Sequence, residues 1–168
     1  MGTIFEQETC VSIYEALDNL GKQIGFQDFD LEFNKKDYNE RKEDKSISNH
    51  PPYHMFLSAR DMLKIGYMML NNGKYNEKQI VPEEWIKEIT SMHTKIENSD
   101  KRKNIGYGYL WWIFDEDKDH PLHKAYSASG CEGQSIVVVP KSNMVIITKN
   151  YIRPSRLLEK IFNIKINE

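Results

Sequence analysis

The segment from Ser127 to Cys131 brings two hydroxyls, a thiol and a glycine together within five positions. Serine and cysteine are common nucleophiles in acyl transfer, and a histidine is the usual base beside them. His123 lies four residues before Ser127, so a Ser127 or Ser129 triad and a Cys131–histidine pair are both conceivable. Small residues beside glycines in a strand are more often packing residues than nucleophiles, which makes both arrangements the weaker interpretation.

Several established catalytic and binding motifs are absent from the 168 residues. No Ser-x-x-Lys, Tyr-x-Asn or Ser-x-Asn occurs, and a Gly-x-Ser-x-Gly elbow is excluded because residue 125 is alanine. The segment Gly130–Gly133 lacks the lysine of a phosphate-binding loop. His50 and His54 are four apart, but the two prolines between them break the helix that would align both rings on one metal. We therefore expect neither a metal nor a cofactor.

Composition narrows the class of protein. Apolar residues make up 39% and charged residues 29% of the chain, and the formal net charge is −2. This balance is typical of a globular domain, and it lacks the basic patch of a nucleic-acid-binding protein. No apolar run reaches the roughly 18 residues that would span a bilayer. We expect no nucleic-acid or membrane partner. No signal peptide is recognised, the natural N-terminus is expected to be missing, and the compartment stays open.

The first half of the chain is predicted to be mostly helical. An apolar stripe indicates a helix over residues 3–20, which Gly21 and Gly25 end. Residues 26–52 are polar and mixed in charge, and a long irregular loop is expected there. The pattern over 58–72 predicts a further helix, with Ser58 as N-cap, Asp61 in a capping box and Gly73 as C-cap. Another helix begins at Pro82.

The second half changes to a strand pattern. Residues 107–114 are rich in aromatic side chains and predict a strand, in which Trp111 and Trp112 face opposite sides. Residues 135–139 and 144–148 predict a hairpin around the turn 140–143, and a last helix is expected over 155–164. The fold class is therefore α+β. A mostly helical part, 1–105, precedes a part, 106–168, with three to four antiparallel strands and a C-terminal helix.

Segments along the whole chain resemble the C-terminal portion of the serine β-lactamase and penicillin-binding-protein superfamily, nearest to its class C-like esterases and amide hydrolases. The matching segments follow one another in the family's order: Ile4–Thr9 with Ser12–Ala16, Ile24–Asp28, Tyr53-His54 with Ser58–Asp61, Gln79–Trp85, Gly106–Trp112, and Ser129–Gln134 with Val138–Pro140. The sequence departs from the family at Cys10 and Glu132, where glycine is common, and Ala128-Ser129-Gly130 stands in place of Lys-Thr-Gly.

The resemblance implies a partial β-lactamase/transpeptidase-like fold and a site wall formed by Ser127, Ala128, Ser129, Gly130 and Cys131. In a complete enzyme the backbone N–H of Cys131 would be one oxyanion donor. Tyr53 and His54 would approach the cleft from the helical side. Strand alternation, and not the resemblance, makes Trp112 a candidate cleft-lining residue, with plain core as the more common role. The family's nucleophile, lysine, tyrosine base and two sheet strands belong to a half that this sequence lacks. We therefore expect no catalytic residue within this chain.

Three hypotheses of different kinds follow. The first is a C-terminal fragment of a serine hydrolase that cleaves ester, amide or peptide-like bonds in a small-molecule acyl substrate, inactive by itself. The second is a catalytically dead domain that binds a ligand or partner. The third is an independent hydrolase that uses Ser129 or Cys131. A sheet that lacks two strands has an open edge, so a homodimer or swapped oligomer is also expected.

Overall fold

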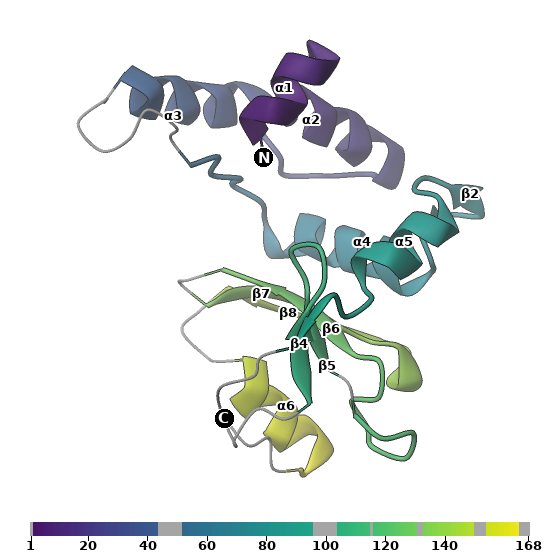
Figure 1. The fold of residues 1–168 in the computed structure, drawn as a ribbon. Helices are drawn as coiled ribbons and strands as arrows, with labels where there is room; N and C mark the ends of the chain where they lie inside the picture. The colour runs from purple at the N-terminus through teal and green to yellow at the C-terminus, as the bar shows by residue number, and fades with distance from the viewer. Residues whose placement is uncertain are drawn as a thin grey trace. The chain divides into compact units, whose positions relative to one another are not determined.

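The computed structural model describes residues 2–43, 52–95, 104–114, 116–130, 133–149 and 154–164 (Figure 1). The chain divides into two compact units, Met1–Asp61 and Met62–Glu168. The division falls inside the helix over 59–70. The α+β class is confirmed. Among the described helices, none combines the length and the apolar character that a membrane span requires.

The predicted helix over 3–20 is two helices, α1 (Gly2–Thr9) and α2 (Ile13–Ile24). The chain turns at Cys10, whose φ of 55° lies in the left-handed region. Ser12 then starts α2 with a capping box: its hydroxyl accepts from the Tyr14 N–H at 3.3 Å, and Glu15 accepts from the Ser12 N–H at 3.4 Å. The prediction missed this break because the apolar stripe continues across it, although Ser-x-x-Glu is itself a helix-start signal.

The expectation of a long irregular loop over 26–52 is wrong for its middle part, because residues Leu31–Glu43 form helix α3. Asp30 caps this helix by accepting the Phe33 N–H at 2.8 Å. Helix α3 has no apolar stripe, and the one buried residue among its described side chains is Asn34. A search for apolar periodicity therefore overlooks it. Residues 44–51 of the expected loop lie outside the described residues.

Helix α4 (Ala59–Leu70) confirms the prediction of a helix over 58–72. The predicted capping box is incomplete, because the Asp61 carboxylate accepts the backbone N–H groups of Gln27 and Asp28 instead of that of Ser58. Ser58 caps the helix by accepting the Asp61 N–H at 3.1 Å. Its end is closed by Gly73, which has a φ of 83° and donates its N–H to Met68 O at 2.9 Å. A Cβ at Gly73 would collide with the carbonyl oxygen of Val81, so this position requires glycine. A small hairpin, β1 (Lys74–Tyr75) and β2 (Lys78–Gln79), leads on to helix α5 (Glu83–Ile89).

The second unit contains a six-stranded antiparallel sheet in the order β3-β4-β5-β6-β7-β8 (Figure 1). Its strands are β3 (Thr94–Lys95), β4 (Ile105–Tyr107), β5 (Trp112–Phe114), β6 (Tyr126–Ser129), β7 (Gln134–Val139) and β8 (Met144–Lys149). The predicted number, three to four, was too low because β3 and β4 are very short. The predicted strand over 107–114 is in fact a hairpin, which closes where Gly108 N donates to Trp111 O at 2.8 Å.

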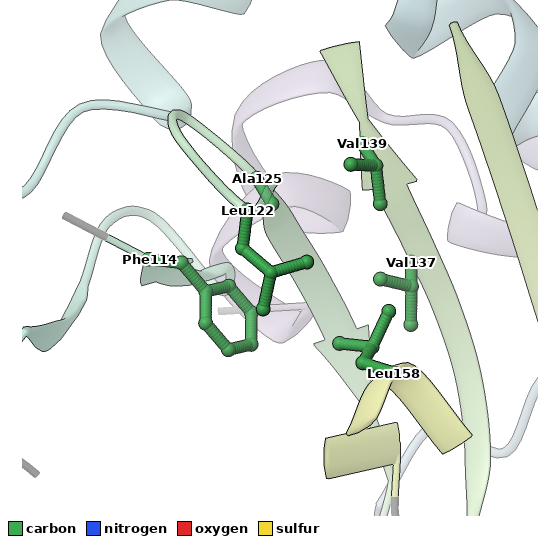
Figure 2. Close-up of a cluster of buried hydrophobic side chains, with 6 residues drawn as sticks. All are labelled: Phe114, Leu122, Ala125, Val137, Val139 and Leu158. Carbon is green, nitrogen blue, oxygen red and sulfur yellow. The ribbon is translucent and has the colours of Figure 1, made fainter. Parts of the chain in front are cut away.

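The core of the second unit lies on both faces of this sheet. On one face, Leu158 of helix α6 (Pro154–Phe162) packs with a cluster of buried side chains, shown in Figure 2: Phe114, Leu122, Ala125, Val137 and Val139. On the other face, Gly66 of α4 lies so close to Val145 and Ile136 that a Cβ there would collide with both. Adjacent residues of β7 thus serve the two faces, as the alternation of a strand requires.

Candidate functional site

The candidate site wall begins at the end of strand β6. In the sheet register Ser127 lies opposite Trp112 of β5 and Val137 of β7, and Ser129 lies opposite Ser135. Residues directly opposite one another in an antiparallel pair place their side chains on the same face. Ser127 and Ser129 therefore share one face with Trp112 and Ser135, while Ala128 points to the other. Alternation along the strands could have predicted this grouping, once the register was known.

The hydroxyls of this group differ in their access to solvent. Ser127 is 3% exposed, whereas Ser129 is exposed and donates to the Ser127 hydroxyl at 3.4 Å. The Ser135 hydroxyl is fully buried and has no hydrogen-bond partner within the described part of the chain. Leaving a buried hydroxyl unpaired is costly, and in native structures such a group calls for an explanation. Sequence analysis did not single out Ser135, because only the register with Ser129 brings it to this site.

The turn after β6 limits which backbone groups can act as oxyanion donors. Gly130 N already donates to Gln134 O at 2.8 Å, and Gly133 N donates to Gly130 O at 3.2 Å. The Thr148 hydroxyl donates to Gly133 O at 2.7 Å, which ties the turn to β8. The N–H of Gly130 is therefore engaged. The predicted donor, Cys131, lies outside the described residues, as does Glu132.

His123 does not complete a triad with the serines. One of its ring nitrogens, Nδ1, lies 2.7 Å from the carbonyl oxygen of Glu116. No hydrogen bond in the described ranges joins His123 to Ser127 or Ser129. A general base must lie within hydrogen-bonding reach of the hydroxyl that it deprotonates. The geometry thus leaves Ser129 without this base.

The side chains of the two adjacent tryptophans lie on opposite faces of the sheet, as strand alternation predicts. Trp111 is buried and contacts the ring of Tyr126 edge to face, with 5.3 Å between ring centroids. Trp112 is partly exposed on the face that carries Ser127, and its ring meets Tyr107 edge to face at 5.0 Å. Burial raises the pKa of Tyr126 far above its ordinary range, and its hydroxyl donates to Met69 O at 3.1 Å. Tyr126 is therefore a neutral structural residue, and Trp112 is the aromatic residue beside the serines.

Tyr53 and His54 belong to the first unit, and the structure shows their surroundings there. The Tyr53 ring stacks on Tyr38 with 4.6 Å between centroids, and its hydroxyl donates to Glu6 Oε2 at 2.9 Å. Burial and the hydrogen bond to Tyr53 raise the pKa of Tyr38. His54 Nδ1 lies 4.0 Å from Asp37 Oδ2. The Tyr53 hydroxyl therefore already has a partner within its own unit, and the cleft-lining role of Tyr53 and His54 stays a prediction.

Within the described ranges, no three His, Cys, Asp or Glu side chains lie close enough together to hold a metal ion. His54 contacts an aspartate and a phenylalanine ring, Phe56, whose centroid lies 6.3 Å away. His50, the other member of the pair considered from sequence, lies outside the described residues.

Two known proteins are similar to part of this chain. No family model matches. A protein of Alkalihalophilus pseudofirmus described as uncharacterized is 30% identical over 99 residues, which cover 55% of this chain and 29% of that protein. A solved structure described as a putative 6-aminohexanoate-dimer hydrolase from Bacillus anthracis is 28% identical, with a TM-score of 0.42. The match covers 64% of this chain and 27% of that one. The chain spans less than a third of the length of each of these two proteins.

Proposed function

We propose that this chain forms one wall of the acyl-transfer site of a β-lactamase-like serine hydrolase. In this proposal the reactive serine and its lysine come from a polypeptide segment outside these 168 residues. The proposal is based on one observation at the end of β6, where residues expected of a site wall occur without the nucleophile motif that such a site needs. Ser129 is exposed beside a glycine turn and shares a face with Trp112, at the positions that the sequence resemblance assigns to the family's site wall, yet the sequence lacks Ser-x-x-Lys.

The proposed reaction is hydrolysis of an ester, amide or peptide-like bond in a small-molecule acyl substrate. The incoming serine oxygen attacks the carbonyl carbon, the leaving group takes up a proton, and water then cleaves the resulting acyl-enzyme. Negative charge develops on the carbonyl oxygen during each attack. A preorganised N–H donor beside that oxygen is worth about 3 kcal/mol in the transition state. This wall would contribute such a donor at or near Cys131, and Ser129 would bind a polar group of the substrate.

The geometry favours this proposal over an independent hydrolase that uses Ser129. Its nearest hydroxyl neighbour is Ser127, which is not a base, and the ring nitrogen Nδ1 of His123 lies against a backbone carbonyl. A serine without a base is a poor nucleophile at neutral pH. A role in substrate binding requires only that the Ser129 hydroxyl be exposed, and it is exposed.

The test compares the chain alone with the chain joined to a segment that contains Ser-x-x-Lys and Tyr-x-Asn, taken from DNA directly upstream. We expect the chain alone to hydrolyse no p-nitrophenyl ester and to form no adduct with a fluorophosphonate. The joined protein should do both, with the adduct on the serine of Ser-x-x-Lys. Turnover by the chain alone would contradict the proposal. A joined protein that folds and binds an acyl ligand without turnover would instead support the ligand-binding domain.

A pair of matched variants then tests the wall itself. In the joined protein, Ser129→Ala should raise KM or lower kcat, because the substrate loses a hydrogen bond worth about 1 kcal/mol. Ser142→Ala removes another exposed serine, from the 140–142 turn, and should leave both constants unchanged. Equal kinetics for all three proteins would exclude Ser129 from the site.

A further inference from the structure

Ser135 of β7 is 1% exposed, and within the described part of the chain its hydroxyl has no hydrogen-bond partner. A buried hydroxyl without a partner destabilises a folded protein relative to an apolar group of similar size. Alanine would occupy the same place in the strand without leaving an unpaired group. The Ser135 hydroxyl therefore does not stabilise the second unit, and its presence calls for another role.

The sheet register makes Ser129 the nearest hydroxyl neighbour of Ser135, since the two residues lie directly opposite one another. In the adjacent pair, Gly130 N donates to Gln134 O at 2.8 Å, which makes it a hydrogen-bonded pair. Ser129 and Ser135 therefore form a non-hydrogen-bonded pair, the kind in which side chains lie closest. Cβ atoms in such pairs are about 4.5–5.5 Å apart, so rotation about the Cα–Cβ bonds can bring the two hydroxyl oxygens within hydrogen-bonding distance.

The hydroxyl on the other side of Ser135 already has a partner. Thr148 lies opposite Ser135 on β8, and its hydroxyl donates to Gly133 O at 2.7 Å. Because the N–H and C=O groups of one residue point to the same side of a strand, Ser135 and Thr148 form a hydrogen-bonded pair, whose side chains stand farther apart. The bond from Ser129 to Ser127, in contrast, measures 3.4 Å, which is long for two hydroxyls. Ser129 is therefore the neighbour that can change its hydrogen-bond partner most easily.

We propose that Ser135 is a positioning residue for substrate binding by Ser129. When an acceptor oxygen of the substrate approaches, the Ser129 hydroxyl turns from Ser127 and donates to that oxygen, while Ser135 donates to the oxygen of Ser129. The buried hydroxyl gains a partner, and the Ser129 hydroxyl is held in one orientation. A hydroxyl that accepts one hydrogen bond donates a stronger one, because each bond polarises the next. This inference rests on the proposed function, since it concerns how Ser129 meets the substrate.

The first test measures the stability of the chain alone by urea unfolding. Ser135→Ala should leave the midpoint unchanged or raise it, because the variant removes a buried hydroxyl that has no partner. Thr148→Val is the matched control, since it removes a buried hydroxyl that is paired with Gly133 O, and it should lower the midpoint. A midpoint that falls as far in Ser135→Ala as in Thr148→Val would show that the Ser135 hydroxyl already stabilises the free protein, and would overturn the proposal.

The second test measures hydrolysis of a p-nitrophenyl ester by the joined protein. Ser135→Ala should lower kcat/KM by about threefold to tenfold, the loss expected when a neutral hydrogen bond to the substrate is weakened. The double variant Ser129→Ala/Ser135→Ala should be no slower than Ser129→Ala alone, because Ser135 acts only through Ser129. Ser135→Thr retains the hydroxyl and should stay close to the wild type. Circular dichroism checks that each variant is folded.

The outcomes separate this inference from the proposed function. If the joined wild-type protein hydrolyses the ester and Ser135→Ala does so equally well, Ser135 has no positioning role, while the proposed function stands. Additive losses in the double variant would likewise overturn the inference, because Ser135 would then act independently of Ser129. A joined wild-type protein that folds without hydrolysing the ester would overturn the proposed function, and this inference with it.

Discussion

The two units of this protein are held together by different kinds of contact. In the first unit, the fully buried carboxylate of Asp61 accepts the backbone N–H groups of Gln27 at 2.8 Å and Asp28 at 3.1 Å. Asn34, 1% exposed, accepts the Phe56 N–H at 2.9 Å. Each contact joins a polar side chain to backbone more than twenty residues away. The first unit is thus organised by buried polar groups that satisfy loop backbone.

The second unit is organised by apolar side chains on a sheet. Its buried cluster between the sheet and α6 is formed by aliphatic and aromatic residues, shown in Figure 2. Burying apolar area stabilises a fold without directional requirements, whereas a buried polar group stabilises it only when its partners are in place. The stability of the second unit therefore depends on how much apolar volume is buried, and that of the first unit on the geometry of its buried hydrogen bonds. Four substitutions examine this difference, in order of decreasing effect.

Leu158→Ala should have the largest effect, a loss of about 3 kcal/mol in the free energy of unfolding of the second unit. Leu158 is fully buried, and its truncation removes apolar contacts and leaves a cavity in the cluster. Urea unfolding followed by tryptophan fluorescence measures this, because Trp85, Trp111 and Trp112 all lie in the second unit. Lys160→Ala, at an exposed position of the same helix, is the control and should change little. Equal effects would mean that α6 is not part of the core.

Asp61→Ala should destabilise the first unit by about 2 kcal/mol, because two backbone N–H groups lose a charged acceptor. Hydrogen exchange of the Gln27 and Asp28 amides reports the loss directly. Asp61→Asn preserves the volume and one acceptor oxygen, so it should cost less than alanine. If the two variants were equally destabilised, the acceptor oxygen that asparagine retains would contribute nothing, and the proposed role of buried hydrogen-bond acceptors in the first unit would fail.

Ser12→Ala should cost about 1 kcal/mol, since it removes the side-chain half of the capping box at the start of α2. We expect faster hydrogen exchange of the amides in the first turn of α2 and unchanged exchange of the amides in β7. Ser12→Asp retains an acceptor at the cap and should exchange like the wild type. If exchange is also faster in Ser12→Asp, then the loss of the capping hydrogen bond is not the cause of the faster exchange in Ser12→Ala.

Glu15→Gln should have the smallest effect, and it depends on pH. Lys35 Nζ lies 2.6 Å from Glu15 Oε1, and the hydrogen bond and charge of Lys35 lower the pKa of Glu15 below its ordinary value of 4.5. A lowered pKa in the folded state contributes stability above that ordinary value, and the contribution is lost as the pH falls through the lowered pKa. Acid unfolding followed by circular dichroism should therefore be less pH-dependent below 4.5 in the variant. An identical acid transition would show that the exposed pair contributes nothing.

Sequence patterns predicted best the elements whose side chains alternate between core and solvent. The helix α4, its cap Ser58, the β7–β8 hairpin and the last helix were all expected from apolar periodicity and turn residues. Helix α3 was missed because its buried residue is polar. The short strands β3 and β4 were missed because two or three residues carry too little periodicity to be recognised.

The sequence alone determined the α+β class and the superfamily resemblance, and it shows that Ser-x-x-Lys is absent. These properties depend on residue types at fixed spacing, which a linear chain displays directly. Only the tertiary structure decided that Ser127 is buried while Ser129 is exposed, that Ser135 joins them, and that Tyr53 is held by Glu6. Such properties arise from contacts between residues far apart in the chain, and no local periodicity encodes which distant partner a polar group will meet.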